Sequence, residues 1–188
     1  MNYLEKIMQI EGAVNSVECQ ELIRLAEQAE DCIVEIGSWK GRSTVALACG
    51  SRMGNNVPVY AIDPHDSHTS TEGRSYGPED NIRFLENILK SGYADLIQII
   101  NLPSNVTVKA WQTLIVEDWK FIDLLFVDGN HDYKEVKKDF RSWEPFVKDN
   151  GYIAMHDSTK EGPAKEIKEA HDWEIVKTVG TLCILRRK

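Results

Sequence analysis

The sequence lacks the cysteine spacing of a zinc-binding or disulfide-rich domain. Its four cysteines form no C-x-x-C pair and no zinc-like cluster; they are Cys19, Cys32, Cys49 and Cys183. Because Cys32 and Cys183 sit inside apolar runs, we expect reduced, mostly buried thiols, as in a cytosolic protein.

A membrane span, a signal pattern and an excess of positive charge are also missing. No stretch approaches the roughly 18 apolar residues that a membrane span requires, and Glu5, Lys6 and Glu11 interrupt the N-terminal segment. The formal net charge of −8 disfavours contact with phosphate backbones and anionic lipid. The sequence therefore predicts a soluble, cytoplasmic protein whose partners include neither nucleic acid nor a membrane.

The sequence does contain a regular alternation of short apolar runs and amphipathic segments over its 188 residues. Strands are predicted at 32–36, 58–62, 96–101, 121–127 and 151–155. Helices are predicted at 42–52, 78–91, 105–117, 132–147 and 161–170. Two more helices precede them, one over 2–10 and one with Ser16 as its N-cap.

This alternation is typical of βαβ units, and hence of a parallel sheet with helices on both faces. The last two strand-like runs, 173–177 and 182–185, are joined by a link too short for a crossover helix. The sequence therefore predicts an α/β, Rossmann-like doubly wound sheet, mostly parallel, with an antiparallel C-terminal hairpin. We expect residues 31–188 to form this domain, and the N-terminal helices of 1–30 to serve as a lid, a cap or a dimer contact.

One long connection stands apart from this pattern. Residues 65–77 contain no aliphatic side chain, and a connection of this length without structure of its own is usually a functional lid or simply mobile.

The first candidate site lies between the strand at 32–36 and the next helix. Its spacing is G-x-x-x-G, which differs from the G-x-G-x-x-G of dinucleotide binders. A carboxylate at Glu35 would repel a diphosphate but could hold an ammonium group, such as that of a methionine moiety. The candidate ligand-binding residues here are Glu35, Gly37, Ser38, Gly41 and Ser43. The alternative is a tight strand-to-helix turn with no ligand.

Two further candidates point to an adenosine. Asp63 follows the second predicted strand, where an acid can accept hydrogen bonds from both ribose hydroxyls, although an Asp-Pro turn is the alternative. Ser104 is expected to line an adenine pocket or to cap a helix. Asp139 and Trp143 are interpreted as structural, and Lys160 as part of a solvated helix face.

Acidic and imidazole side chains end two later strands. Asp128 and His131 follow the strand at 121–127, and His156 and Asp157 follow the strand at 151–155. Because neighbouring parallel strands end at the same edge, these groups should face one crevice. They could bind a divalent cation or move a proton, whereas helix capping by either aspartate is the alternative.

Four segments together resemble the class I methyltransferases of methyltransferase domain family 24, grouped with macrolide sugar O-methyltransferases. They are Val34–Ser38 with Gly41–Thr44, Ala61–Pro64, Phe126–Tyr133 and Gly151–Asp157. The resemblance covers roughly residues 30–160. It implies a seven-stranded sheet, S-adenosylmethionine as the cofactor and often a divalent metal.

The resemblance also implies roles for individual residues. In related catechol-type enzymes an aspartate and an Asp-Asn pair hold the metal, and the matching positions here are Asp128 and the pair His156–Asp157. Those enzymes have a lysine base where this chain has His131. An imidazole can also accept a hydroxyl proton, and a histidine ligand suits softer ions than magnesium, such as manganese.

The sequence therefore predicts methyl transfer from S-adenosylmethionine to a small hydroxylated molecule, assisted by magnesium or manganese. Asp128 and His131 are the expected catalytic residues, Asp128 also borders the cofactor, and Asp128, His156 and Asp157 are the expected metal ligands. A homodimer is expected through the N-terminal helices. The alternatives are a nucleotide-cofactor oxidoreductase and a non-catalytic module that binds the same cofactor.

Overall fold

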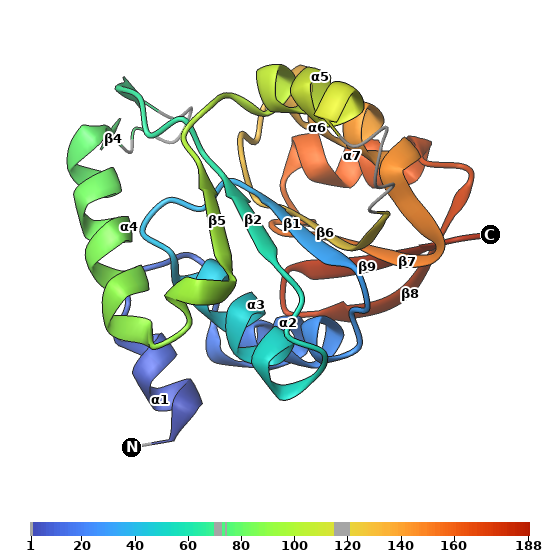
Figure 1. Ribbon diagram of the computed structural model, residues 1–188. Coiled ribbons are helices and arrows are strands. Elements are labelled where there is room, and N and C mark those ends of the chain that lie inside the picture. Colours follow the sequence, from blue (N-terminus) through green and yellow to red (C-terminus); the bar gives the residue numbers. More distant parts are fainter. Residues whose placement is uncertain (1, 70–72, 74, 115–120) are drawn as a thin grey trace.

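The computed structural model describes residues 2–69, 73, 75–114 and 121–188. Its centre is a seven-stranded sheet in the order β5-β2-β1-β6-β7-β9-β8 (Figure 1). The strands are β1 (Cys32–Ile36), β2 (Val59–Ile62), β5 (Ile97–Ile100), β6 (Ile122–Val127), β7 (Val147–Met155), β8 (Trp173–Val179) and β9 (Leu182–Arg187). The first five are parallel, and β9 pairs antiparallel with both β7 and β8. The predicted fold class is confirmed.

Helices cover both faces of the sheet because the buried strands are apolar on both sides. In β1, Ile33 packs into one core, and Cys32, Val34 and Ile36 pack into the other. The first core is covered by α1 (Tyr3–Met8), α2 (Ser16–Glu27), α3 (Arg42–Met53) and α4 (Pro78–Ser91). The second is covered by α5 (Ser104–Leu114), α6 (Tyr133–Trp143) and α7 (Glu161–Glu169) (Figure 1).

The strand order fixes where a ligand can bind. From β1 the chain moves outward to β2 and β5, and it then returns to the other side of β1 to form β6. The connections that leave the carboxyl ends of β1 and β6 therefore diverge to opposite faces, which opens a crevice at this topological switch point.

Two predicted helix boundaries are wrong. Asn15, and not Ser16, caps α2: its Oδ1 accepts from the amides of Val17 and Glu18 at 3.0 and 3.2 Å, and Glu18 accepts from the Asn15 amide. The helix predicted at 132–147 ends at Trp143. A 3₁₀ turn (Glu144–Phe146) containing Pro145 follows it, because proline lacks the amide that would continue the helix, and β7 begins directly after the turn.

The polar connection at 65–77 does carry structure of its own. Two short strands, β3 (His68–Thr69) and β4 (Ser75–Tyr76), pair antiparallel within it. Its residues 70–72 and 74 lie outside the described part of the chain, as do 115–120, where the predicted helix at 105–117 was expected to end. Whether the connection acts as a lid stays a prediction.

The four cysteines are free and buried, as predicted. Within the described residues, every helix is too short or too polar to cross a membrane.

Candidate active site

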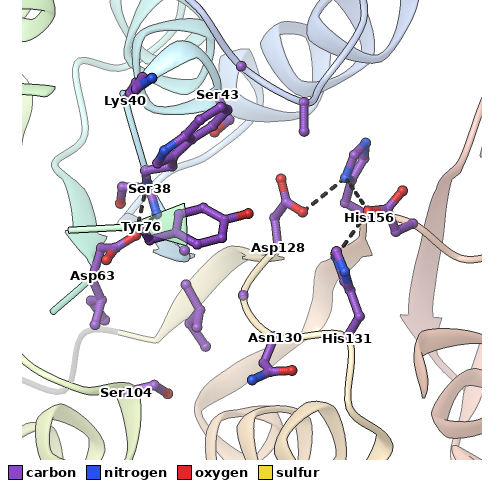
Figure 2. A pocket seen from close by; sticks show the side chains of 18 of the residues that line it. Ser38, Lys40, Ser43, Asp63, Tyr76, Ser104, Asp128, Asn130, His131 and His156 are labelled. Atoms are coloured by element: carbon purple, nitrogen blue, oxygen red, sulfur yellow. Dashed lines mark hydrogen bonds and ion pairs between the residues drawn. The ribbon is translucent and has the colours of Figure 1, made fainter. Parts of the chain in front are cut away.

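A cavity of about 900 Å³ lies at the switch point, which is a usual size for a small-molecule site. Figure 2 shows side chains from several strand ends facing it. Ten of the sequence-predicted residues line this cavity: Gly37, Ser38, Gly41, Ser43, Asp63, Ser104, Asp128, His131, His156 and Asp157. The structure thus brings the three candidate sites together.

The loop between β1 and α3 forms one wall and requires glycine at Gly37. Gly37 has a φ of +89°, and a Cβ there would lie 2.3 Å from the carbonyl oxygen of Asp128. Gly41 has the same φ and caps α3. Trp39, between them, is held at a φ of 41°, a conformation that is uncommon for a bulky side chain. Such strained backbone tends to cluster at functional sites.

Asp63 holds this loop in place. Its Oδ2 accepts the backbone amides of Ser38 and Trp39 at 3.0 and 2.9 Å, and its Oδ1 accepts the amide of His65 at 2.8 Å. Since a carboxylate offers about four acceptor positions, hydroxyl donors in the cavity can still bind it. Asp63 therefore orders the loop and lines the cavity, and its contact with a ribose stays a prediction.

Glu35 is the predicted site residue that the structure does not place on the wall. Its side chain is fully buried beneath the loop, and its Oε2 accepts from the Thr44 hydroxyl at 2.5 Å. Burial raises the pKa of Glu35 to about 7, although hydrogen bonds from the hydroxyls of Ser43 and Thr44 oppose the shift. Glu35 supports the start of α3 from below, and its contact with an ammonium group stays a prediction.

His156 joins two carboxylates from distant parts of the chain. Its Nδ1 lies 2.9 Å from Asp128 Oδ1, and its Nε2 lies 3.4 Å from Glu18 Oε2. Burial disfavours charge on the ring, but the hydrogen bond to Asp128 and the nearby carboxylates outweigh it and raise the pKa of His156 to about 9. His156 is therefore a buried cation that orients Asp128 (Figure 2).

His131 and Lys160 converge on Asp157. The His131 Nε2 and the Lys160 Nζ lie 3.0 and 2.9 Å from Asp157 Oδ2. Burial alone would raise the pKa of Asp157, but these two hydrogen bonds and the His156 charge hold it well below its usual range. Asp157 also has a φ of 51°. The interpretation of Lys160 as a solvated residue is wrong, because the turn after β7 brings it into the cavity wall.

Three side chains of the cavity could hold a divalent cation. Asp128, His131 and Asp157 each offer a ligand atom, and these atoms lie within 4.8 Å of one another. Two carboxylates and an imidazole suit manganese better than magnesium. His156 was also predicted as a ligand; its two ring nitrogens face Asp128 and Glu18, and its binding to a metal stays a prediction.

A lid or cap was expected from the N-terminal helices, but sequence patterns named no single site residue there. Residues 11–15 and Glu18 line the cavity. Arg42 holds this segment, since its guanidinium donates to the carbonyls of Ile10, Gly12 and Val14 at 2.6, 2.7 and 2.8 Å. The Asn-x-x-Glu capping pattern could have located the start of α2, but no local signal links Glu18 to a histidine 138 positions away.

A comparison with protein families decides the class of this site. The model of a methyltransferase domain matches residues 34–158. The chain belongs to methyltransferase domain family 24. The family resemblance over roughly 30–160 is confirmed, and this methyltransferase has its four matching segments around the one cavity.

Solved structures with the same fold include three methyltransferases. The O-methyltransferase from Bacillus cereus in complex with S-adenosylhomocysteine is 17% identical, with a TM-score of 0.68 over 99% of this chain and 90% of that one. TomG from Streptomyces achromogenes is an O-methyltransferase of tomaymycin synthesis, solved in complex with S-adenosylmethionine. It is 14% identical, with a TM-score of 0.67 over 100% of this chain and 90% of that one. The calicheamicin methyltransferase CalS11 is 12% identical, with a TM-score of 0.67 over 89% of this chain and 76% of that one. At these identities the likeness concerns the fold.

Proposed function

We propose that this methyltransferase transfers the methyl group of S-adenosylmethionine to a hydroxyl oxygen of a small molecule. The observation that carries the proposal is the convergence of the β1–α3 loop, Asp63, Asp128 and His131 on one cavity of about 900 Å³. Two solved structures with this fold, both named O-methyltransferases, hold S-adenosylmethionine or S-adenosylhomocysteine, which supports the same cofactor here.

The cavity offers complementary groups along the length of the cofactor. The loop from Gly37 to Gly41 lets a ligand approach its backbone, and Asp63 offers acceptors to the ribose hydroxyls. The acidic groups near Asp128 favour the positive sulfonium over a diphosphate. A dinucleotide oxidoreductase is less well supported, because Trp39 occupies the position of the second glycine of its fingerprint.

His131 is the proposed general base. Its Nε2 lies 3.0 Å from Asp157 Oδ2 and its Nδ1 lies 3.3 Å from Lys160 Nζ. Nδ1 is therefore the nitrogen that would take the proton, with Lys160 then held by Asp157. As the acceptor hydroxyl gives its proton to the imidazole, its oxygen attacks the methyl carbon. The carbon–sulfur bond then breaks, the sulfur keeps the electron pair, and S-adenosylhomocysteine is released. Positioning of the two reactants supplies much of the rate.

The same region favours a second role for His131. Asp128, His131 and Asp157 would hold a divalent cation, which would stabilise a deprotonated acceptor oxygen. In a neutral imidazole only one nitrogen has a free lone pair. If that nitrogen of His131 binds a cation, the ring cannot also take the proton, so the two roles exclude each other.

The proposal is tested by incubating the full chain with methyl-labelled S-adenosylmethionine and a panel of sugars, phenols and hydroxylated polyketides. We expect label on an acceptor oxygen, and we expect His131→Gln to lower the rate at least about 100-fold. Affinity for S-adenosylhomocysteine, measured by calorimetry, should stay unchanged. His171→Gln is the matched control, because His171 is exposed and outside the cavity.

Chelation separates the two roles of His131. If no cation takes part, treatment with EDTA leaves the transfer rate unchanged. Loss of transfer after EDTA, with recovery on addition of manganese, would show that a cation takes part, and weaker manganese binding by His131→Gln would then place His131 among its ligands. Full activity of His131→Gln would exclude both roles.

A further inference from the structure

Exposed apolar side chains gather on one short stretch of the chain. Among residues 2–69, 73, 75–114 and 121–188, twelve large apolar side chains are exposed, and six of them lie between residues 82 and 106. They are Ile82, Leu85 and Leu89 on α4, Ile99 on β5, Leu102, and Val106 on α5. Single exposed leucines are ordinary, but a gathered set marks an interaction surface.

The three side chains on α4 form one row along the helix. Leu85 follows Ile82 by three residues and Leu89 follows Leu85 by four, which is the spacing of neighbours on one helix face. Phe84 and Ile88 form a separate row that is buried in the first core. Packing against the sheet therefore uses one apolar row of α4 and leaves the second exposed. Leu89, at 76%, is the most exposed of the twelve side chains.

The outermost strand of the sheet extends this row. β5 ends the seven-stranded sheet on the side of α4 (Figure 1), and Asn101, directly after β5, lies with its Nδ2 3.4 Å from Asn81 Oδ1 on α4. Because β2 and β5 are parallel, the helix that connects them runs in the opposite direction. Four helical residues and two strand residues both cover about 6 Å, so Leu85 comes level with Ile99.

The row on α4 is complementary to a second copy of itself. The first turn of α4 contains Glu79 and Asp80, and its last turn contains Lys90. When two such helices pack antiparallel about a two-fold axis, the acidic turn of each lies beside the basic turn of the other. An axis that passes near Leu85 also places Ile82 of one copy opposite Leu89 of the other.

The area of the surface matches what a dimer requires. The exposed fractions of the six side chains run from 38% to 76%, so together they expose roughly 500 Å² of mostly apolar surface. An interface of standard size covers about 800 Å² on each partner, and about 65% of a homodimer interface is apolar, which is again roughly 500 Å².

We propose that these six side chains form the interface of a homodimer in which two copies of α4 pack antiparallel. A second copy fits better than a different protein, because the same row supplies both sides of the contact. The interface differs from the one expected through the N-terminal helices, since none of the six side chains lies within residues 1–30. The proposal does not depend on the proposed function.

Sedimentation equilibrium of the full chain over a range of micromolar concentrations tests the proposal. The wild type should be a dimer. Leu89→Glu should raise the dissociation constant at least about 100-fold, because each dimer loses two buried leucines and places two carboxylates near acidic first turns. Ile175→Glu is the matched control. Ile175 is 58% exposed on β8, at the opposite end of the sheet, so the dissociation constant should stay within about twofold.

Leu85→Cys gives a second reading that does not depend on weakening the dimer. A short bismaleimide should link two copies through this cysteine, because the two-fold axis brings the two side chains together, and Ile175→Cys should stay unlinked. The four native cysteines are buried.

A wild type that stays monomeric at every concentration, as for a surface that binds a different protein, would overturn the proposal. A dimer that Leu89→Glu leaves intact would overturn it as well. So would a dimer that dissociates in Val17→Glu instead, since Val17 is exposed on α2 and would place the contact on the N-terminal helices.

Discussion

At the scale of single residues, the charged side chains of this site mostly hold backbone in place. Asp63 accepts three backbone amides, Arg42 donates to three backbone carbonyls, and Glu18 accepts the amides of Asn15 and Thr181. Hydrogen bonds with one charged partner are roughly twice as strong as neutral ones. They therefore suit loops that must keep an unusual conformation next to a ligand.

Glu35 should make stability depend on pH. The pKa of Glu35 is about 7 in the folded protein, and the ordinary glutamate value of 4.5 applies to the unfolded chain. Between these pH values the unfolded chain releases a proton that the folded protein keeps. The free energy of unfolding should therefore fall as pH rises from about 4.5 to about 7, by up to about 3 kcal/mol. Glu35→Gln removes this titration, and urea unfolding across that pH range should give a flatter profile.

Glu30→Gln serves as the control for this measurement. Glu30 precedes β1 with 77% of its side chain exposed, so its removal should leave the slope unchanged. Parallel profiles for the wild type and Glu35→Gln would contradict the role assigned to burial.

At the scale of elements, local patterns predicted which helices and strands form but not the contacts between them. The apolar run at 32–36 and the periodicity at 78–91 matched β1 and α4, because burial itself produces those patterns. The end of α6 was missed although Pro145 marks it, and the ribbon of β3 and β4 was missed because it is short and polar.

The segment between α1 and α2 depends on Arg42. Lysine at this position keeps the charge but cannot span the carbonyls of Ile10, Gly12 and Val14. We expect Arg42→Lys to speed amide hydrogen exchange of residues 10–15 about 10- to 100-fold, because up to about 3 kcal/mol of local stabilisation is lost.

Arg24→Lys is the matched control for this exchange experiment. Arg24 lies on α2 and pairs with Glu21, with 46% of its side chain exposed. Its substitution should leave exchange at 10–15 unchanged. Equal exchange in Arg42→Lys and the wild type would show that other contacts hold the segment.

At the scale of the whole molecule, the strand order explains why sequence positions far apart form one site. Alternation of strands and helices predicted that Asp63, Asp128 and Asp157 follow parallel strands that end at the same edge of the sheet. It could not predict that Glu18 faces His156 or that Asp139 reaches the cavity, since such contacts depend on packing between layers. A homodimer through the N-terminal helices, a cytoplasmic location and the boundary at residue 30 stay predictions.

Calorimetric titration of the full chain with S-adenosylhomocysteine tests the central claim most directly. We predict one-to-one binding that Asp63→Asn weakens at least about 10-fold, because the amide would turn an N–H donor toward backbone amides or ribose hydroxyls. Asp149→Asn, with 99% of the Asp149 side chain exposed, should bind like the wild type. Absence of binding at millimolar concentrations, in a wild type that is folded, would contradict the account.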